Sequence, residues 1–285
     1  MARIFVVGST GMLGRYIASY LAKLGHNIVC ITRVDVDASV ATYSSLFEIF
    51  KNYSVKVSDE NIVINCVGII PQSKSVNDTS SRSYFRINSL FPNMLSVVCK
   101  DYNMRYIHIT TDCVFSGKEG KYTEESLHDE INDYGVSKSL GELGINATII
   151  RTSIIGEETK NKYSLLEWVK GQKDTCVNGY NNHLWNGVTC LQLSKIISQI
   201  IAEKTYWHGI RHIFSPTHVS KYELVKMISD IYNLNVTVNK HDTKEPIDKT
   251  LDTKYDTCKL LNIPELHAQL IELQQYRDLK SITFI

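Results

Sequence analysis

The chain has 285 residues, 43% of them hydrophobic and 21% charged, and its 31 basic and 30 acidic side chains give a formal net charge of +1 at pH 7 with histidine neutral. This near-neutral balance, without a long run of like charges, argues against a nucleic-acid partner. No apolar run approaches the roughly 18 residues of a membrane span, and the seven cysteines form no C-x-x-C pair, so we expect no membrane partner and a cytoplasmic protein with reduced thiols.

Apolar and amphipathic segments alternate through the first half of the chain. This pattern predicts strands at 3–7, 27–32, 61–67, 106–110 and 147–151, and helices at 11–24, 83–100 and 134–143. Pro92 is expected to kink or interrupt the second of these helices, because proline lacks the N–H that an α-helix requires. Alternating strands and helices are typical of a doubly wound parallel sheet, so we predict a Rossmann-type α/β fold.

Beyond about residue 152 the alternation becomes irregular. Helices are predicted at 162–170, 191–203 and 221–232, and a strand at 210–214. We therefore predict a Rossmann domain at 1–152 and a smaller C-terminal α/β substrate lobe at 153–285. Some later segments, at about 185–215, are expected to return to the first domain.

His208 and His212 have the spacing of a helical zinc pair. The predicted strand at 210–214 would keep the two imidazoles from converging as they do on a helix, and no further ligand cluster follows. We therefore expect no metal site.

A glycine-rich turn joins the first predicted strand to the first predicted helix. In such a turn Gly8 permits a tight bend, Gly11 lets the backbone approach a pyrophosphate, and Gly14 allows close packing of helix and strand. The motif predicts a dinucleotide site. Its candidate contacts are Gly8, Thr10, Gly11, Met12, Leu13 and Gly14.

The end of the second predicted strand bears on which dinucleotide binds. An arginine there accommodates the 2′-phosphate of NADP, whereas an acidic residue accepts the ribose hydroxyls of NAD. Arg33 occupies this position, which favours NADPH and NADP+. Asp35 and Asp37 follow closely, so NADH is the alternative cofactor.

Tyr134 and Lys138 stand four residues apart in a predicted helix, so their side chains share one face. An ammonium beside a phenol favours the phenolate, which lets the tyrosine exchange a proton near neutral pH. Taken alone, such a pair also fits a solvated helix surface. Thr111 ends a predicted strand upstream, and together with the glycine turn these residues favour a redox site.

With these motifs in order, the chain resembles the extended short-chain dehydrogenase/reductases, and more closely the dTDP-4-dehydrorhamnose reductases. The resemblance runs nearly end to end. It rests on Gly8-x-x-Gly11-x-x-Gly14, Asn65-Cys66-Val67-Gly68, Asn88, Thr110-Thr111-Asp112-x-Val114-Phe115-x-Gly117, Tyr122-x-Glu124-Glu125, Tyr134-x-x-x-Lys138, Arg151, Ser220-Lys221-Tyr222-Glu223-Leu224 and Leu251-Asp252-Thr253.

The resemblance implies that NADPH reduces the C4 ketone of a sugar nucleotide held by the C-terminal lobe. Tyr134 would protonate the alkoxide, Lys138 would lower the pKa of that tyrosine and hold the nicotinamide ribose, and Thr111 would hydrogen-bond the carbonyl oxygen. It also implies further cofactor contacts at Cys66, Val67 and Gly68, and substrate contacts at Thr111, Asp112, Cys113, Asn182 and Trp185.

Cys113 departs from the family pattern, which has tyrosine there. Strand residues two apart face the same side, so Cys113 is expected to share the face of Thr111. A cysteine here resembles GDP-fucose synthase and the plant UDP-rhamnose enzymes, which implies a bifunctional 3,5-epimerase and 4-reductase that yields an NDP-L-rhamnose. The second acid/base would be Lys162, with Lys160 or His183 as alternatives.

Simpler interpretations remain open. Cys113 also fits a small buried apolar residue, Lys162 a solvated lysine, and His183 a polar loop residue. The protein would then be a 4-reductase alone, or a non-catalytic NADP-binding subunit like the regulatory subunit of methionine adenosyltransferase. The sequence leaves open the UDP or dTDP carrier, the oligomeric state (a homodimer is one option) and the fate of the product.

Overall fold

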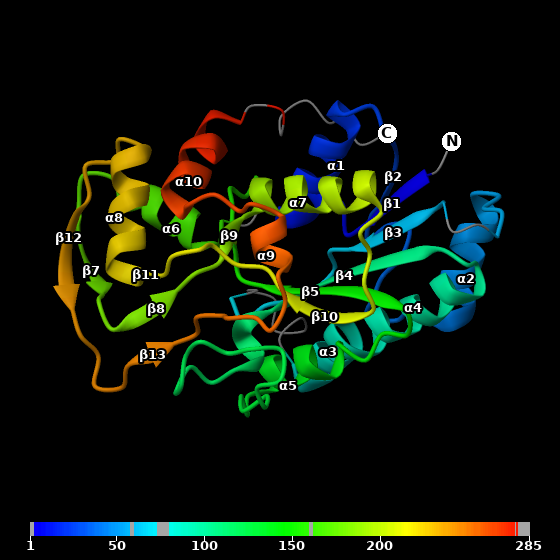
Figure 1. Cartoon of the computed structure of the whole chain (residues 1–285), viewed down its shortest axis with the longest axis horizontal. Coiled ribbons are helices and arrows are strands. Elements are labelled where there is room, and N and C mark those ends of the chain that lie inside the picture. Colours follow the sequence, from blue (N-terminus) through cyan, green and yellow to red (C-terminus); the bar gives the residue numbers. More distant parts are fainter. Residues whose placement is uncertain (1–2, 58–59, 73–79, 160–161, 277, 279–285) are drawn as a thin grey trace.

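The computed structural model describes residues 3–57, 60–72, 80–159, 162–276 and 278 (Figure 1). At its centre is a six-stranded sheet of order β10-β5-β4-β3-β1-β2, in which every pairing is parallel. The strands are β1 (Arg3–Val7), β2 (Asn27–Ile31), β3 (Ile62–Asn65), β4 (Arg105–Thr111), β5 (Ala147–Thr152) and β10 (Gly209–His212). The Rossmann-type prediction is confirmed.

Helices cover both faces of this sheet (Figure 1). In β1, Ile4 and Val6 belong to the apolar cluster that contains α1 (Met12–Lys23) and α7 (Cys190–Glu203). Their neighbours Phe5 and Val7 belong to a second cluster, which contains α2 (Tyr43–Asn52) and α4 (Phe91–Asp101). Alternate residues of a strand point to opposite faces, so a strand covered on both sides is apolar throughout.

The predicted helix at 83–100 is a longer helical run with a local distortion. It consists of α3 (Ser81–Tyr84), a π-helical segment labelled η1 (Phe85–Leu90) and α4. The distorted segment ends directly before the first turn of α4, which contains Pro92. A distortion is expected here because proline has no N–H to donate to the carbonyl of Asn88, four residues earlier. That carbonyl faces Gly141, where a Cβ atom would lie 2.1 Å from the Asn88 oxygen, so the next helix approaches closely.

The second half forms smaller sheets and helices, as predicted. The strands pair as β7 (Cys176–Tyr180) with β12 (Thr237–His241), as β8 (His183–Trp185) between β11 (Val219–Ser220) and β13 (Ile247–Asp248), and as β6 (Ile154–Ile155) with β9 (Val188–Thr189). The helices are α6 (Leu165–Lys170), α8 (Lys221–Ile231), α9 (Thr257–Leu260) and α10 (Leu266–Gln275). In the described part of the chain, no helix has both the length and the apolar character needed to cross a membrane.

Two segments of the second half adjoin the main sheet. The strand β10 pairs with β5, and α7 packs in the same apolar cluster as α1. The division into two domains at residue 152, with segments near 185–215 returning to the first, stays a prediction. The sequence analysis missed α2, α9 and α10.

Arg151 is a fully buried cation near the end of β5. Its guanidinium donates to Glu142 through Nε at 3.1 Å and Nη2 at 2.5 Å. It also donates to the Nε2 atoms of His212, at 2.8 Å, and His128, at 2.7 Å. Burial, and then the charge of Arg151, lowers the pKa of His212 to about 4, so its imidazole stays neutral and can accept. Because Glu142 closely follows α5 (Asp133–Leu140), this network fixes the position of that helix.

The first prediction concerns this network. Arg151→Met leaves the Glu142 carboxylate buried without its cation, and we expect a loss of about 3–5 kcal/mol in the free energy of unfolding. Urea titration followed by circular dichroism measures it. Lys51→Met, which breaks the exposed Lys51–Glu48 pair on α2, is the control and should cost about 1 kcal/mol or less. Equal losses in the two variants would contradict the assigned importance of the buried pair.

Candidate active site

The glycine-rich turn between β1 and α1 has the predicted geometry. Gly8 has a φ of +81°, in the region that favours glycine, and its N–H donates to the Ile31 carbonyl at 2.9 Å. At Gly14, a Cβ atom would lie 2.2 Å from the Gly8 carbonyl oxygen. The start of α1 can therefore approach the turn only because position 14 has no side chain.

A hollow opens beside this turn, along the carboxyl ends of β1, β2 and β3. Its lining contains most of the predicted cofactor contacts, namely Gly8, Thr10, Gly11, Arg33, Cys66, Val67 and Gly68. Asp37, considered above as a residue that could serve NADH, also lines it, and the remaining lining residues were not predicted, namely Thr32, Val36, Ala38, Ile69 and Ile87. Met12 and Leu13 do not line it, since Leu13 is part of the apolar core and Met12 packs against that core.

Arg33 and the acidic residues near it form hydrogen bonds within the turn after β2. Asp35 accepts hydrogen bonds from the backbone N–H and the hydroxyl of Thr32, at 2.7 and 2.8 Å. Asp37 accepts from Ser39 and from Arg33, and these bonds lower its pKa although burial opposes the shift. The Arg33 side chain is 66% exposed at the edge of the hollow. The guanidinium thus lies at the rim of the hollow while it is paired with Asp37 at 3.2 Å.

Thr111 and Tyr134 come together at the carboxyl end of β4. Tyr134 lies in the first turn of α5, whose N-cap residue Asn132 accepts the N–H of Gly135 at 2.8 Å. The side chain of Thr111 lies close enough to the Tyr134 phenol to act on its pKa. The Thr111 hydroxyl also donates to Asp112 Oδ1 at 3.0 Å. A strand end and a helix start thus bring together the hydroxyl and the phenol that the motifs predict.

The protonation states of Tyr134 and Lys138 are set mainly by burial. Burial raises the pKa of the Tyr134 phenol well above its ordinary value, only partly offset by the Thr111 side chain. Burial also lowers the pKa of Lys138 to about 8. Desolvation is thus the largest influence on both groups, and the lowering of the tyrosine pKa by Lys138 stays a prediction. A protonated phenol is the form that can donate a proton.

Lys138 points toward the loop after β3. A Cβ atom at Gly68 would lie 2.6 Å from Lys138 Nζ, so the ammonium reaches the backbone that lines the cofactor hollow. Asn88 connects the same loop to α5, because its amide exchanges hydrogen bonds with the backbone of Ile69, at 3.0 and 3.1 Å, and donates to Ser137 at 3.2 Å. Asn88 is part of the family motif, but no local pattern predicts these contacts.

Cys113 lies beside Thr111 for a reason other than the expected one. Strand β4 ends at Thr111, and Asp112–Val114 form a 3-10 turn, so the two-residue strand alternation does not apply. The thiol nevertheless donates to Asp112 Oδ1 at 3.6 Å, the same oxygen that Thr111 contacts. Burial, and then the charge of Asp112, raises the pKa of Cys113 to about 12, so the thiol is protonated at neutral pH.

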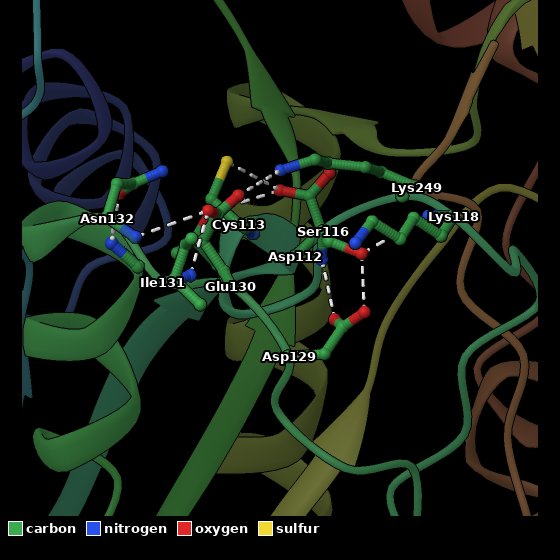
Figure 2. A network of polar contacts seen from close by, with 12 residues as sticks. Asp112, Cys113, Ser116, Lys118, Asp129, Glu130, Ile131, Asn132 and Lys249 are labelled. Atoms are coloured by element: carbon green, nitrogen blue, oxygen red, sulfur yellow. Dashed lines mark hydrogen bonds and ion pairs between the residues drawn. The ribbon is translucent and has the colours of Figure 1, made fainter. Parts of the chain in front are cut away.

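Two lysines that the sequence analysis did not select lie near this thiol. Figure 2 shows the Lys249 side chain extending toward Asp112 and Cys113, with its ammonium paired to Glu130 at 3.5 Å. Lys221, at the start of α8, has its ammonium 5.0 Å from the centre of the Trp185 ring and interacts electrostatically with Asp112 and Cys113. Both come from the distant C-terminal segments, so sequence proximity gives no signal of them.

Several predicted substrate and acid/base residues have other surroundings. The amide of Asn182 bonds to the backbone of Thr243, at 2.8 and 3.1 Å, and to its hydroxyl at 3.2 Å. His183 is bonded to the same hydroxyl at 2.9 Å. Trp185 is only 4% exposed and belongs to the apolar core.

The lysines at 160 and 162 were the leading candidates for the second acid/base. Lys162 is exposed, and its role as the second acid/base stays a prediction. Lys160 lies outside the described residues.

His208 and His212, whose spacing was rejected above as a zinc pair, are the remaining sequence signal. His212 lies in β10, as the predicted strand required, and its imidazole is bonded to Arg151. Over the described ranges, no three His, Cys, Asp or Glu side chains are grouped as a metal site would need.

Known proteins resemble this chain over most of its length. A dTDP-4-keto-6-deoxy-D-glucose reductase from Streptomyces niveus is 26% identical over 243 residues, which covers 79% of this chain and 77% of that protein. A dTDP-4-dehydrorhamnose reductase from Aggregatibacter actinomycetemcomitans is 26% identical over 241 residues, covering 81% and 79%. The crystal structure of a dTDP-4-dehydrorhamnose reductase from Bacillus anthracis in complex with NADP has the same fold, with a TM-score of 0.79, 20% identity, and coverage of 96% of this chain and 98% of that one.

The sequence model of one protein family, the RmlD substrate binding domain, matches nearly the whole chain. The match extends from residue 2 to residue 277 and so includes both the glycine-rich turn and the C-terminal sheets. This protein belongs to the RmlD substrate binding domain family.

Proposed function

We propose that this protein is an NADPH-dependent reductase of the C4 ketone of a nucleotide-linked 4-keto-6-deoxyhexose. The observation that carries the proposal is the convergence of Thr111, Tyr134 and Lys138 beside the hollow at the glycine-rich turn. A hydroxyl, a protonated phenol and an ammonium are the groups that a carbonyl reduction requires next to a nicotinamide.

The residues of the hollow fit a dinucleotide phosphate. The turn at Gly8 and the start of α1 offer backbone N–H groups to a pyrophosphate. Arg33, exposed at the rim, would bind the 2′-phosphate of NADPH, which supplies the hydride for the reduction. Asp35 and Asp37 are already bonded within the turn, which supports NADPH over NADH.

Two side chains would bind the substrate ketone. The Thr111 hydroxyl and the Tyr134 phenol hydrogen-bond the C4 oxygen, and Tyr134 then gives its proton to the alkoxide that forms. Stabilising that oxygen contributes a few kcal/mol, which corresponds to about 100-fold or more in rate. The raised pKa of Tyr134 keeps the proton on the phenol until the alkoxide, a stronger base, accepts it.

Lys138 would act on the cofactor side. Its ammonium reaches the backbone of Gly68, where a nicotinamide ribose could accept its hydrogen bonds. With its pKa lowered to about 8, it still carries most of its positive charge at pH 7. It can therefore offset the negative charge left on Tyr134 after proton transfer.

The names of the relatives support this class of substrate. Both curated relatives are reductases of dTDP-linked 4-keto-6-deoxy sugars, one of the glucose form and one of dehydrorhamnose. The carrier nucleotide of this chain, UDP or dTDP, is a question for the assay. A non-catalytic NADP-binding role would not require Thr111, Tyr134 and Lys138 to be retained together.

Cys113 supports a second activity, 3,5-epimerisation before reduction, with an NDP-L-rhamnose as the product. The C4 ketone acidifies the hydrogens on C3 and C5, and the donors that stabilise an alkoxide also stabilise an enolate. The Cys113 thiol shares Asp112 Oδ1 with Thr111, so it lies next to the proposed ketone site. As a protonated thiol, Cys113 would be the acid in epimerisation, and a second side chain would be the base.

The second prediction concerns the cofactor. Arg33→Ala removes a charge-assisted bond to the 2′-phosphate, and we expect kcat/KM for NADPH to fall by about 10- to 100-fold. The value for NADH, which lacks this phosphate, should change little and is the internal control. Steady-state kinetics with both cofactors would measure the two values. Equal losses for NADPH and NADH would be inconsistent with the assigned contact.

The third prediction tests the reduction. Tyr134→Phe keeps the ring but removes the proton donor, so kcat with dTDP- or UDP-linked 4-keto-6-deoxyhexoses should fall by about 100-fold or more, while the Kd for NADPH stays similar. Oxidation of NADPH is followed by absorbance. Tyr43→Phe, on the exposed side of α2, is the matched control. If the unaltered protein binds NADPH but oxidises it with none of these sugars, the non-catalytic alternative gains support.

The fourth prediction separates epimerisation from reduction. A bifunctional enzyme given un-epimerised 4-keto-6-deoxyglucose nucleotide and NADPH should form the L-rhamnose nucleotide, identified by NMR. Cys113→Ala should abolish that conversion because the acid is lost, and should spare reduction of the pre-epimerised ketone. A D-sugar product from the unaltered protein would identify a reductase without epimerase activity.

A further inference from the structure

Lys221 is a half-buried cation close to Trp185 and to the proposed ketone site. It is the first residue of α8, and its ammonium lies over the Trp185 ring, 5.0 Å from the ring centre. Within the described ranges, that ammonium forms no hydrogen bond or ion pair. A ring face replaces only part of the hydration that a half-buried ammonium gives up, so this arrangement costs stability.

The position of Lys221 on its helix adds to that cost. The N-terminus of a helix carries a partial positive charge, which repels a cation there. The capping box of α8 uses Ser220 and Glu223, whose carboxylate accepts from the backbone and hydroxyl of Ser220 rather than from Lys221. Burial lowers the pKa of Lys221, which increases the fraction of neutral amine at neutral pH. A cation held at such cost indicates a functional role.

Three lysines have Cys113 in their electrostatic environment, and two of them have other roles. Lys138 reaches the cofactor hollow at Gly68, and Lys249 is paired with Glu130. Lys221 interacts with both Asp112 and Cys113 and has no such partner. It is therefore the amine near the thiol that is available to a substrate.

We propose that Lys221 and Cys113 are the base and the acid that exchange the protons on the carbons flanking the C4 ketone. This rests on the epimerase part of the proposed function and replaces Lys162 and His183 as the second acid/base. His183 is bonded to Thr243, and Lys162 is exposed to solvent.

The step is balanced in protons and involves no oxidation or reduction. The neutral amine of Lys221 takes the proton from C5 or C3, and the electron pair of that C–H bond forms an enolate whose oxygen is held by Thr111 and Tyr134. The Cys113 thiol then delivers a proton to the opposite face of the same carbon. Transfer of the proton from the Lys221 ammonium to the thiolate restores both groups for the next carbon.

The test measures hydrogen exchange in D2O. The protein with bound NADP+, which cannot reduce the ketone, is incubated with dTDP- and UDP-4-keto-6-deoxyglucose, and deuterium at C3 and C5 is followed by NMR and mass spectrometry. The unaltered protein should incorporate deuterium. Lys221→Arg keeps a positive charge but cannot supply a neutral base, so incorporation should fall by about 100-fold or more.

Two controls make the result specific. Lys226 is an exposed lysine on the same helix, and the Lys226→Met variant should incorporate deuterium into the substrate at the unaltered rate. The melting temperature and the Kd for NADPH of each variant show whether it is folded. Reduction of pre-epimerised substrate is measured in parallel. For Lys221→Arg, the loss of exchange should exceed any loss of reduction by about ten-fold or more, because a residue that only binds substrate would affect both.

Other results would overturn the inference. If Lys221→Arg incorporates deuterium at the unaltered rate, Lys221 is not the base. If only Lys162→Met loses deuterium incorporation, Lys162 is the base, as first expected. If the unaltered protein reduces 4-keto sugars but incorporates no deuterium, the inference fails and the reductase proposal stands. If it reduces none of them, the proposed function itself fails.

Discussion

The buried contact between Arg151 and Glu142 is the interaction on which the geometry of the site most depends. It connects the end of β5 to the residue just beyond α5, the helix that carries Tyr134 and Lys138. The same guanidinium donates to His128 and His212, which lie in the loop before α5 and in β10. Because a buried cation tolerates few alternative arrangements, the rotation of α5 relative to β4 is fixed. The proximity of the Thr111 and Tyr134 side chains depends on that rotation.

The strands of the main sheet and the glycine-rich turn could be predicted because their signals are local. Residues 4–7 are uniformly apolar because both faces of β1 are covered, and Gly14 is required by one close contact with Gly8. Helix α2 was missed, although Leu46 and Phe50 lie on its buried side four residues apart. Its other positions mix polar and apolar residues, so the periodicity in so short a helix is weak.

The site was harder to predict where tertiary contacts decide it. Cys113 was correctly expected near Thr111, but on the assumption of a continuing strand, whereas a 3-10 turn around Asp112 brings the two side chains together. Lys221 and Lys249 are more than a hundred residues from Cys113 in sequence. They reach it through the packing of α8 and β13 around β8, which no local pattern encodes. Lys162 was favoured by its sequence position alone, and sequence position does not determine where its side chain lies.

Desolvation sets the protonation states of the site in a consistent direction. It is the largest cause of the raised pKa of Tyr134 and Cys113 and of the lowered pKa of Lys138 and Lys221. The acids therefore keep their protons and the amines lose theirs more readily, which is what proton delivery to an alkoxide and proton removal next to a ketone require. A sugar ring bound in the cleft would displace water and so strengthen all four shifts. Substrate binding would then favour the reactive protonation states further, whereas a charged substituent near Cys113 would oppose them by restoring a counter-charge.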